Sequence, residues 1–186
     1  MKKSIIFIVV AMLCLLFKAY GQGLPIQNIK PLAIGDKVPE IVFEKILNGN
    51  KQPISLSSLK GKAVILDFWA TWCSACIKGF PHMQELQQKY GKNLQVLLIG
   101  DSVRDTEEKL TKFLLDREKD GSPLTLPVAY NDLLTKLLFP HKMFPHYVWI
   151  GADRRVKAIT RGIEVTDINV DRFVAGLELS LPKKDL

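Results

Sequence analysis

Cysteine is scarce in this sequence, with three in 186 residues, and histidine is equally rare. Cys73 and Cys76 stand in one four-residue motif, while Cys14 lies alone near the N-terminus. No second close pair exists, so the usual four-ligand zinc site is disfavoured and a framework of several disulfides is excluded. A bridge between positions this near would close too short a loop to stabilise the fold much. The pair is therefore expected to do chemistry.

Long hydrophobic runs are also missing, apart from one at the N-terminus. Residues 5–17 are all apolar and follow two lysines, but thirteen residues fall short of the roughly 20 that a helix needs to cross a bilayer. Small residues at Ala19 and Gly21 complete the pattern of a secretory signal peptide, predicted over residues 1–21. Tyr20 weakens the cleavage site, so an uncleaved N-terminal anchor is the alternative. We expect an exported, periplasmic protein.

No block of basic residues alternating with aromatic ones is present. The formal charge is +7, and loss of the signal peptide with its three lysines lowers it to +4. The remaining basic residues are scattered among acidic ones, which is typical of a solvated surface, so no nucleic-acid partner is predicted. With 47% hydrophobic and 24% charged residues, the composition is that of an ordinary globular protein.

The length and the distribution of proline predict one domain after a lead-in. Residues 22–34 contain Pro25 and Pro31 and no usable periodicity, so we expect a flexible, extended segment there. Residues 35–186 are enough for one well-filled domain and too few for two ordinary ones.

Hydrophobic periodicity predicts strands alternating with helices within that domain. Residues 41–47 and 54–56 flank a turn at 48–51 and form a predicted hairpin. Residues 63–69 are nearly all apolar and predict a central strand buried on both faces. Apolar residues at helical spacing from Ile77 to Tyr90 predict a helix that carries Cys76 in its first turn. A strand over 94–99 and a helix from 105 to 119, with Asp105 and Glu108 as its capping box, are predicted to follow. The remaining predicted elements are a strand over 126–130, a short helix over 131–139, strands over 147–150 and 156–160, and a helix over 166–177. This order indicates an α/β three-layer sandwich around a mixed sheet.

The cysteine pair falls where the central strand passes into a helix. A thiolate is the nucleophile in disulfide exchange, so a reactive cysteine needs surroundings that lower its pKa from about 8.5. Unpaired backbone N–H groups and the helix dipole supply them at a helix N-terminus. The position predicts that Cys73 attacks and that Cys76, one turn further on, resolves the mixed disulfide.

The stretch Asp67-Phe68-Trp69-Ala70-Thr71-Trp72-Cys73-x-x-Cys76, followed by Pro81, resembles the thioredoxin superfamily. More narrowly, it is similar to the exported TlpA/ResA-type branch, which also carries an N-terminal hairpin. The resemblance covers about residues 35 to 178 and implies a thioredoxin fold with that hairpin as an extension. Two features depart from related patterns: Gly79 stands where many of these relatives have glutamate, and the strand over 94–99 lacks a lysine partner for Asp67.

The resemblance also implies a cis-proline beside the cysteines, and Pro145, directly before a predicted strand, occupies the matching position. The backbone of Phe144 would then face Cys73 and pair with an extended substrate chain. Trp72, Ser74 and Ala75 are the expected substrate contacts around the thiol. The alternative for Pro145 is a trans-proline that opens an edge strand.

Asp67 matches the buried acid that thioredoxins place near the resolving cysteine. Burial would raise its pKa and let it take the proton of Cys76. The alternative is a structural acid bonded to backbone. His82 is a conceivable third zinc ligand but is expected on another side of the helix, and His141 and His146 are expected to be surface or loop residues. No metal and no cofactor is predicted.

The leading functional hypothesis is an envelope dithiol reductase that acts on protein disulfides or thiols and takes electrons from a membrane donor. A dithiol oxidase or isomerase of DsbA type is the alternative within enzymes, although Ser74-Ala75 lacks the histidine of strong oxidants. A Sco-like copper chaperone is the alternative outside enzymes. It is disfavoured because that family places three residues between its cysteines and this chain has two.

Overall fold

The computed structural model describes residues 29–184. The predicted signal peptide over 1–21 and most of the lead-in lie outside the described residues. From Pro31 onward the chain forms one compact unit. Within residues 29–184 no helix has the length and apolar content required to cross a membrane.

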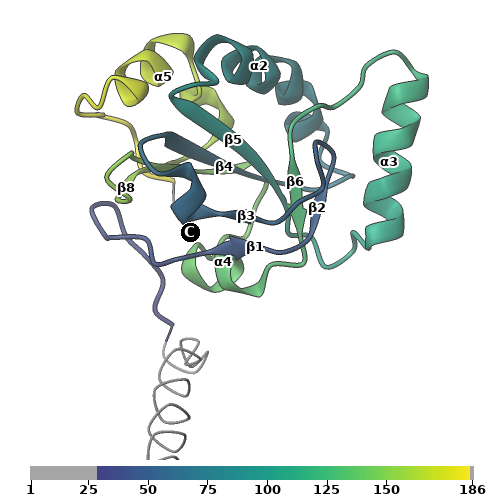
Figure 1. Ribbon diagram of the computed structural model, residues 1–186, viewed down its shortest axis with the longest axis horizontal. Coiled ribbons are helices and arrows are strands. Elements are labelled where there is room, and N and C mark those ends of the chain that lie inside the picture. Colours follow the sequence, from purple (N-terminus) through teal and green to yellow (C-terminus); the bar gives the residue numbers. More distant parts are fainter. Residues whose placement is uncertain (1–28, 185–186) are drawn as a thin grey trace, which may run out of the picture. The chain divides into compact units, whose positions relative to one another are not determined.

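A six-stranded mixed sheet forms the centre of this unit (Figure 1). Its order is β2-β6-β5-β4-β7-β8. The strands are β2 (Ile46–Leu47), β4 (Ala63–Trp69), β5 (Leu94–Gly100), β6 (Val128–Tyr130), β7 (His146–Ile150) and β8 (Val156–Thr160). β4, β5 and β6 run parallel, while β2, β7 and β8 pair antiparallel with their neighbours. The predicted mixed sheet is thereby confirmed, with β4 buried along its whole length.

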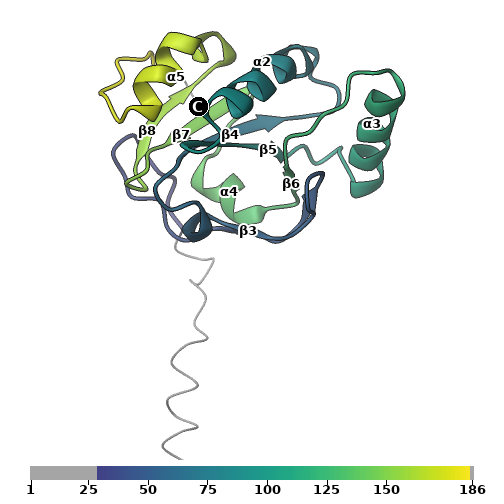
Figure 2. The ribbon, with the colours of Figure 1, turned by 45° about the horizontal axis from the view of Figure 1, so that its top comes forward.

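Helices cover both faces of the sheet, as the three-layer prediction requires. They are α2 (Ser74–Tyr90), α3 (Glu107–Lys119), α4 (Leu133–Leu138) and α5 (Asp167–Val174). Figure 2 shows α2 and α5 above the sheet, and α4 below it near β3 (Ile54–Ser55). Residues 29–184 also contain two short 3-10 helices, η2 (Leu56–Leu59) and η3 (Gly162–Glu164).

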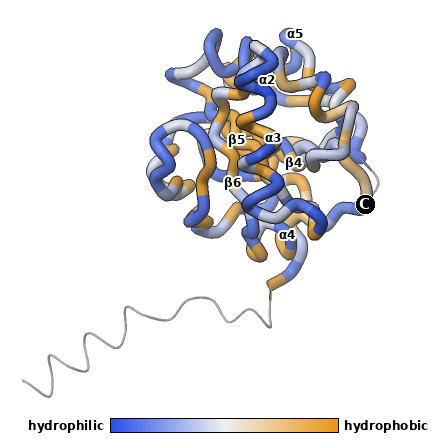
Figure 3. Tube along the Cα trace, turned by 90° about the vertical axis from the view of Figure 1, so that its right-hand side faces the viewer, coloured by the Kyte–Doolittle hydropathy of each residue, from blue (hydrophilic) through white to orange (hydrophobic). Residues whose placement is uncertain are grey.

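The core lies mainly between the sheet and the α2 face. Side chains alternate along a strand, so Ile65, Asp67 and Trp69 of β4 share one face. Ile65 and Trp69 belong to a buried cluster with Phe80 of α2 and Leu110 of α3. Figure 3 shows the apolar residues gathered along the central strands, with hydrophilic ones on the outer helices. Asp67 is thus a carboxyl group within an otherwise apolar layer.

The predicted N-terminal hairpin is only partly correct. β1 (Val42–Phe43) pairs antiparallel with β3, which is the expected hairpin contact. The predicted single strand over 41–47 is broken, however, because β2 turns away and pairs with β6 at the edge of the main sheet. Asn48 fixes this course, since its side-chain amide donates to the Leu124 carbonyl at 2.6 Å. A partner about eighty residues away decides the break, and no local pattern marks it.

The predicted cap of α3 is wrong by one position. Thr106 is the N-cap residue, and its side chain accepts a hydrogen bond from the Lys109 N–H. Asp105 and Thr106 are both suitable capping types, so local propensity does not separate them. Asp105 is engaged elsewhere, in the loop before the cysteines.

Candidate active site

Cys73 and Cys76 form a disulfide at the point where β4 leads into α2. The Cys73 N–H donates to the Ala70 carbonyl at 3.0 Å, which closes the turn after the strand. Cys73 is the N-cap residue of α2, and its sulfur accepts from the Cys76 N–H at 3.2 Å. Strand, turn and helix start thereby hold the sulfur of Cys73 at a helix N-terminus, where a thiolate is stabilised.

The two sulfurs differ in their access to solvent. Cys73 is 6% exposed, whereas Cys76 is 0% exposed and belongs to the apolar cluster under the helix. A substrate sulfur approaching from outside therefore meets Cys73. Ser74 and Ala75, which lie between them, are exposed at the start of α2. This placement agrees with the geometry predicted for an attacking and a resolving cysteine.

The loop before Cys73 is held by the carboxylate of Asp105, which the sequence predicted to be a helix cap. Both oxygens of Asp105 accept hydrogen bonds from Thr71, at 2.8 Å from its backbone N–H and 2.6 Å from its hydroxyl. Next to Thr71, the Trp72 indole N–H donates to the Ser102 hydroxyl at 3.2 Å. The loop after β5 thus fixes the loop after β4. Adjacent carboxyl ends of parallel strands were the available signal for this contact.

The peptide bond between Phe144 and Pro145 is cis, as predicted. The Phe144 ring meets the Trp72 ring edge-on, with centroids 5.7 Å apart. Trp72 is 57% exposed, so this aromatic pair lies at the surface between the two loops. Within residues 29–184, neither the N–H nor the C=O of Phe144 has a hydrogen-bond partner. An incoming chain finds both groups free.

Asp67 is fully buried, and neither carboxyl oxygen makes a hydrogen bond of ordinary geometry to a residue of the described range. Burial raises the pKa of Asp67 well above its usual value of 3.8, and the smaller effect of the Tyr147 hydroxyl lowers it. Tyr147 is the cross-strand partner of Asp67 on β7. Burial, followed by the charge of Asp67, likewise raises the pKa of Tyr147. The acid therefore tends to hold a proton.

Tyr147 has a place near the active site that sequence reasoning missed. Its hydroxyl lies 3.6 Å from the point that a Cβ of Gly79 would occupy. That is an ordinary van der Waals distance, so the hydroxyl lies directly beside α2 at Gly79. The antiparallel register opposite Asp67 was the signal, but it becomes visible only once β4 and β7 are known to pair.

His141 lies in the loop before β7, as predicted, but His146 is neither a surface nor a loop residue, which corrects the sequence prediction. His146 is 0% exposed and begins β7, and the two imidazole rings stack with centroids 4.5 Å apart. Both nitrogens of His146 lack a hydrogen-bond partner among the described residues. Burial, with smaller contributions from His141 and Lys184, lowers the pKa of His146 to about 3. The prediction failed because the strand begins at His146 rather than at Tyr147.

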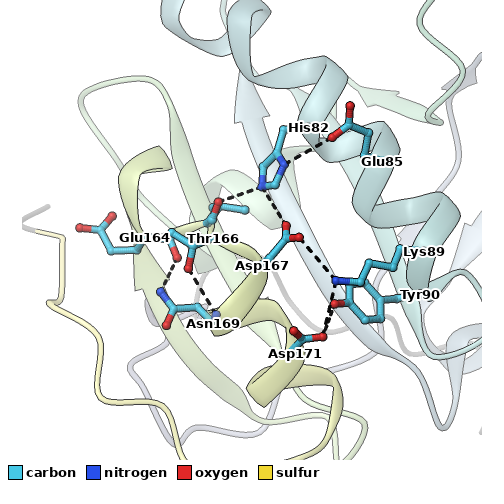
Figure 4. Close-up of polar contacts among 10 residues, drawn as sticks. His82, Glu85, Lys89, Tyr90, Glu164, Thr166, Asp167, Asn169 and Asp171 are labelled. Atoms are coloured by element: carbon cyan, nitrogen blue, oxygen red, sulfur yellow. Dashed lines mark hydrogen bonds and ion pairs between the residues drawn. The ribbon is translucent and has the colours of Figure 1, made fainter.

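His82 faces α5 (Figure 4). Its Nε2 lies 3.1 Å from the Val165 carbonyl, and its ring stands between Glu85 and Asp167 at 3.9 Å from each carboxylate. Further along α2, Lys89 pairs with Asp167. These contacts hold α2 against α5. No group of three metal-binding side chains of His, Cys, Asp or Glu type occurs within residues 29–184.

Comparison with known proteins gives consistent matches. The model of the AhpC/TSA family matches residues 34–136. A thiol-disulfide oxidoreductase ResA from Bacillus cereus is 36% identical over 149 residues, which cover 78% of this chain and 80% of the relative. The ResA of Oceanobacillus iheyensis is 32% identical over 136 residues, covering 72% and 68%.

Solved structures agree on the fold. A thiol:disulfide interchange protein from a Bacteroides species is 25% identical with a TM-score of 0.57, and the match covers 78% of this chain and 92% of that one. A thioredoxin-like superfamily protein with 18% identity reaches a TM-score of 0.62, covering 82% and 100%. The thioredoxin-like fold predicted from the sequence is confirmed.

Proposed function

We propose that this chain, which belongs to the AhpC/TSA family, is an exported thiol-disulfide oxidoreductase that reduces protein disulfides through Cys73 and Cys76. The ResA relatives support the reaction class. One observation carries the assignment of roles: Cys73 is the N-cap of α2 and reachable, while Cys76 is completely buried behind it. Direction and compartment are parts of the proposal.

The reaction begins with both cysteines reduced. The Cys73 thiolate attacks one sulfur of a substrate disulfide, so a bond forms between the two sulfurs while the substrate S–S bond breaks and its other sulfur leaves as a thiolate. Cys76, as thiolate, then attacks the Cys73 sulfur. The Cys73–Cys76 disulfide forms, the mixed disulfide breaks, and the second substrate sulfur leaves. Two electrons pass to the substrate, and an external dithiol donor restores the enzyme.

Asp67 supplies the proton acceptor that the second step needs. Cys76 must lose a proton in an apolar layer, and Asp67 lies in the same layer, on the same face of the sheet. A carboxylate whose pKa is raised by burial is a stronger base than an exposed one, so Asp67 in its ionised form can take that proton and release it later.

The substrate chain is placed against the cis-proline loop. The free N–H and C=O of Phe144 offer main-chain hydrogen bonds to an extended segment. Trp72, Ser74 and Ala75 line the approach to Cys73 from the helix side. Protein disulfides in the envelope are the proposed substrates, and a membrane dithiol protein is the proposed donor.

Trapping tests this function. In Cys76→Ser the first step proceeds but resolution fails, so mixed disulfides with substrate proteins should accumulate in the native cells and disappear under reducing agent. Cys73→Ser is the matched control and should trap nothing. If Cys73→Ser keeps wild-type activity toward a test disulfide, the proposal is wrong.

The redox state of the wild-type protein in cells separates a reductase from an oxidase or isomerase. A reductase is held mostly as the dithiol in cells and its trapped partners carry disulfides before the encounter, whereas an oxidase is held as the disulfide. Alkylation of free thiols in rapidly acidified cells measures the ratio of dithiol to disulfide.

The N-terminal sequence of the protein from the envelope fraction tests export, since cleavage is expected after Gly21. Titration of the reduced protein with Cu(I) tests the copper-chaperone alternative, which requires tight binding.

A further inference from the structure

The C-terminal tail returns to the cis-proline loop through one buried lysine. Lys184 is 4% exposed, and its Nζ donates to the Met143 carbonyl at 2.6 Å and to the Pro145 carbonyl at 2.7 Å. Its backbone N–H donates to the Ile159 carbonyl of β8 at 3.0 Å. The tail is therefore tied both to the sheet and to the loop.

An ammonium group is costly to bury, and its position shows how the cost is offset. Charge-assisted hydrogen bonds are about twice as strong as neutral ones, and Lys184 makes two of them to main-chain oxygens. Burial still lowers the pKa of Lys184 to about 8, with Arg161 adding to the effect. Lys184 thus fixes the conformation of the loop, although its ammonium group loses hydration when it is buried.

The two carbonyls that Lys184 holds lie on either side of Phe144. With Met143 and Pro145 fixed, the intervening residue keeps one backbone course, and its own N–H and C=O remain unpartnered within residues 29–184. The Phe144 ring, in turn, rests against Trp72 beside the attacking cysteine. The lysine acts on the loop without reaching the disulfide.

We infer that Lys184 is a positioning residue for polypeptide substrates, because it fixes the Met143–Pro145 loop in the course that presents the Phe144 backbone to an extended chain. The inference rests on the proposed function. A disulfide within a protein uses both the loop and Cys73. A small aromatic disulfide needs Cys73 far more than the loop, so Lys184 sets the preference between these two substrate classes.

Steady-state kinetics on the full chain test the inference. We compare the wild type, Lys184→Met and the neighbouring exposed control Lys183→Met, with insulin as the protein disulfide and dithiobis-nitrobenzoate as the small one. Removal of two charge-assisted hydrogen bonds should raise the KM for insulin about tenfold and change kcat little. The ratio of kcat/KM for insulin to that for the small disulfide should fall about tenfold. Lys183→Met should keep the wild-type ratio.

Three results would overturn the inference, and a fourth would overturn the proposed function instead. An unchanged insulin KM in Lys184→Met contradicts it, and an equal loss on both substrates shows a merely structural role. If Lys184→Met does not fold, Lys184→Gln replaces it, because the amide keeps two uncharged donors and should give an intermediate KM; a wild-type KM there contradicts the inference. If the wild type reduces neither substrate, the proposed function fails instead.

Discussion

The loops beside the disulfide contain charged side chains that are hydrogen-bonded, whereas the strands beneath it contain buried polar side chains that are not. The Asp105 side chain accepts two hydrogen bonds that hold the loop before Cys73. The Lys184 side chain donates two that hold the cis-proline loop. Asp67 and His146 lie on the adjacent strands β4 and β7, and their side-chain oxygens and nitrogens make no hydrogen bond of ordinary geometry within residues 29–184. Paired charges fix geometry. Unpaired buried groups cost stability, and that cost depends on their protonation state.

At neutral pH the largest expected effect comes from breaking a paired group. Asp105→Ala removes two bonds to Thr71, one of them to a backbone N–H, and should lower the free energy of unfolding by about 2 to 3 kcal/mol. Denaturant unfolding measures it. Asp116→Ala, which removes only an exposed pair with Lys112, is the control and should cost less than about 0.5 kcal/mol. Equal costs in the two variants would remove the distinction.

His146 should make the fold sensitive to acid. Its pKa is near 3 in the folded chain against the usual 6.5, so the unfolded chain binds a proton first as the pH falls. Its contribution to stability is present above pH 6.5 and is lost between 6.5 and 3, with a slope of about 1.4 kcal/mol per pH unit. His146→Phe and His146→Leu should both reduce that slope in thermal or denaturant unfolding. A slope identical to that of the wild type would mean that His146 gains a partner in solution.

Asp67 should show the opposite dependence. Its pKa is raised by burial, so its contribution to stability is complete below about pH 3.8 and declines as the pH rises through the folded pKa. Asp67→Asn should therefore be more stable than the wild type at pH 8, by about 1 kcal/mol or more, and the gain should vanish at pH 4. Resolution of the mixed disulfide should be slower in the same variant, as stopped-flow mixing with a substrate would show. A faster or unchanged step would exclude the acid from the proton transfer.

The smallest effect should join the two loops. Trp72 and Phe144 touch edge-on at the surface, so a double-mutant cycle with alanine at each position should give a coupling of about 0.5 to 1 kcal/mol. Unfolding of the two single variants and the double variant provides the four terms. Coupling near zero would show that the ring contact adds nothing and that Asp105 and Lys184 hold their two loops independently.

The sequence predicted the parts of the site that depend on local pattern. The apolar run of β4, the helical spacing after the cysteines and the proline before β7 lie within short segments, and the structure confirms all three elements. The hairpin was only partly predicted, because the course of residues 44–47 depends on the free edge of β6. A local pattern does not report a distant edge.

The roles of Asp105 and Lys184 were not predicted, for a related reason. Asp105 reads as a helix cap until Thr71, 34 residues earlier, is known to lie beside it. Lys184 reads as one of two tail lysines until the tail is known to return to the loop. The burial of His146 was hidden in the same way, because a histidine at a strand boundary is ordinarily exposed. These features arise from tertiary contacts that join separate segments.

Segments near both ends of the described chain also lie along an edge of the sheet, where another copy of the protein could pair. An open strand edge is a template for pairing with another molecule and hence for aggregation. Beyond β8, the Gly35 N–H donates to the Val156 carbonyl at 2.8 Å, the Val156 N–H donates to the Asp36 carbonyl at 3.0 Å, and Lys184 covers the Ile159 carbonyl. At the other edge, two-residue β2 covers β6. Segments near both ends of the described chain thus cover part of the β8 edge, and loss of the tail would expose the Ile159 carbonyl of that edge to pairing with another copy.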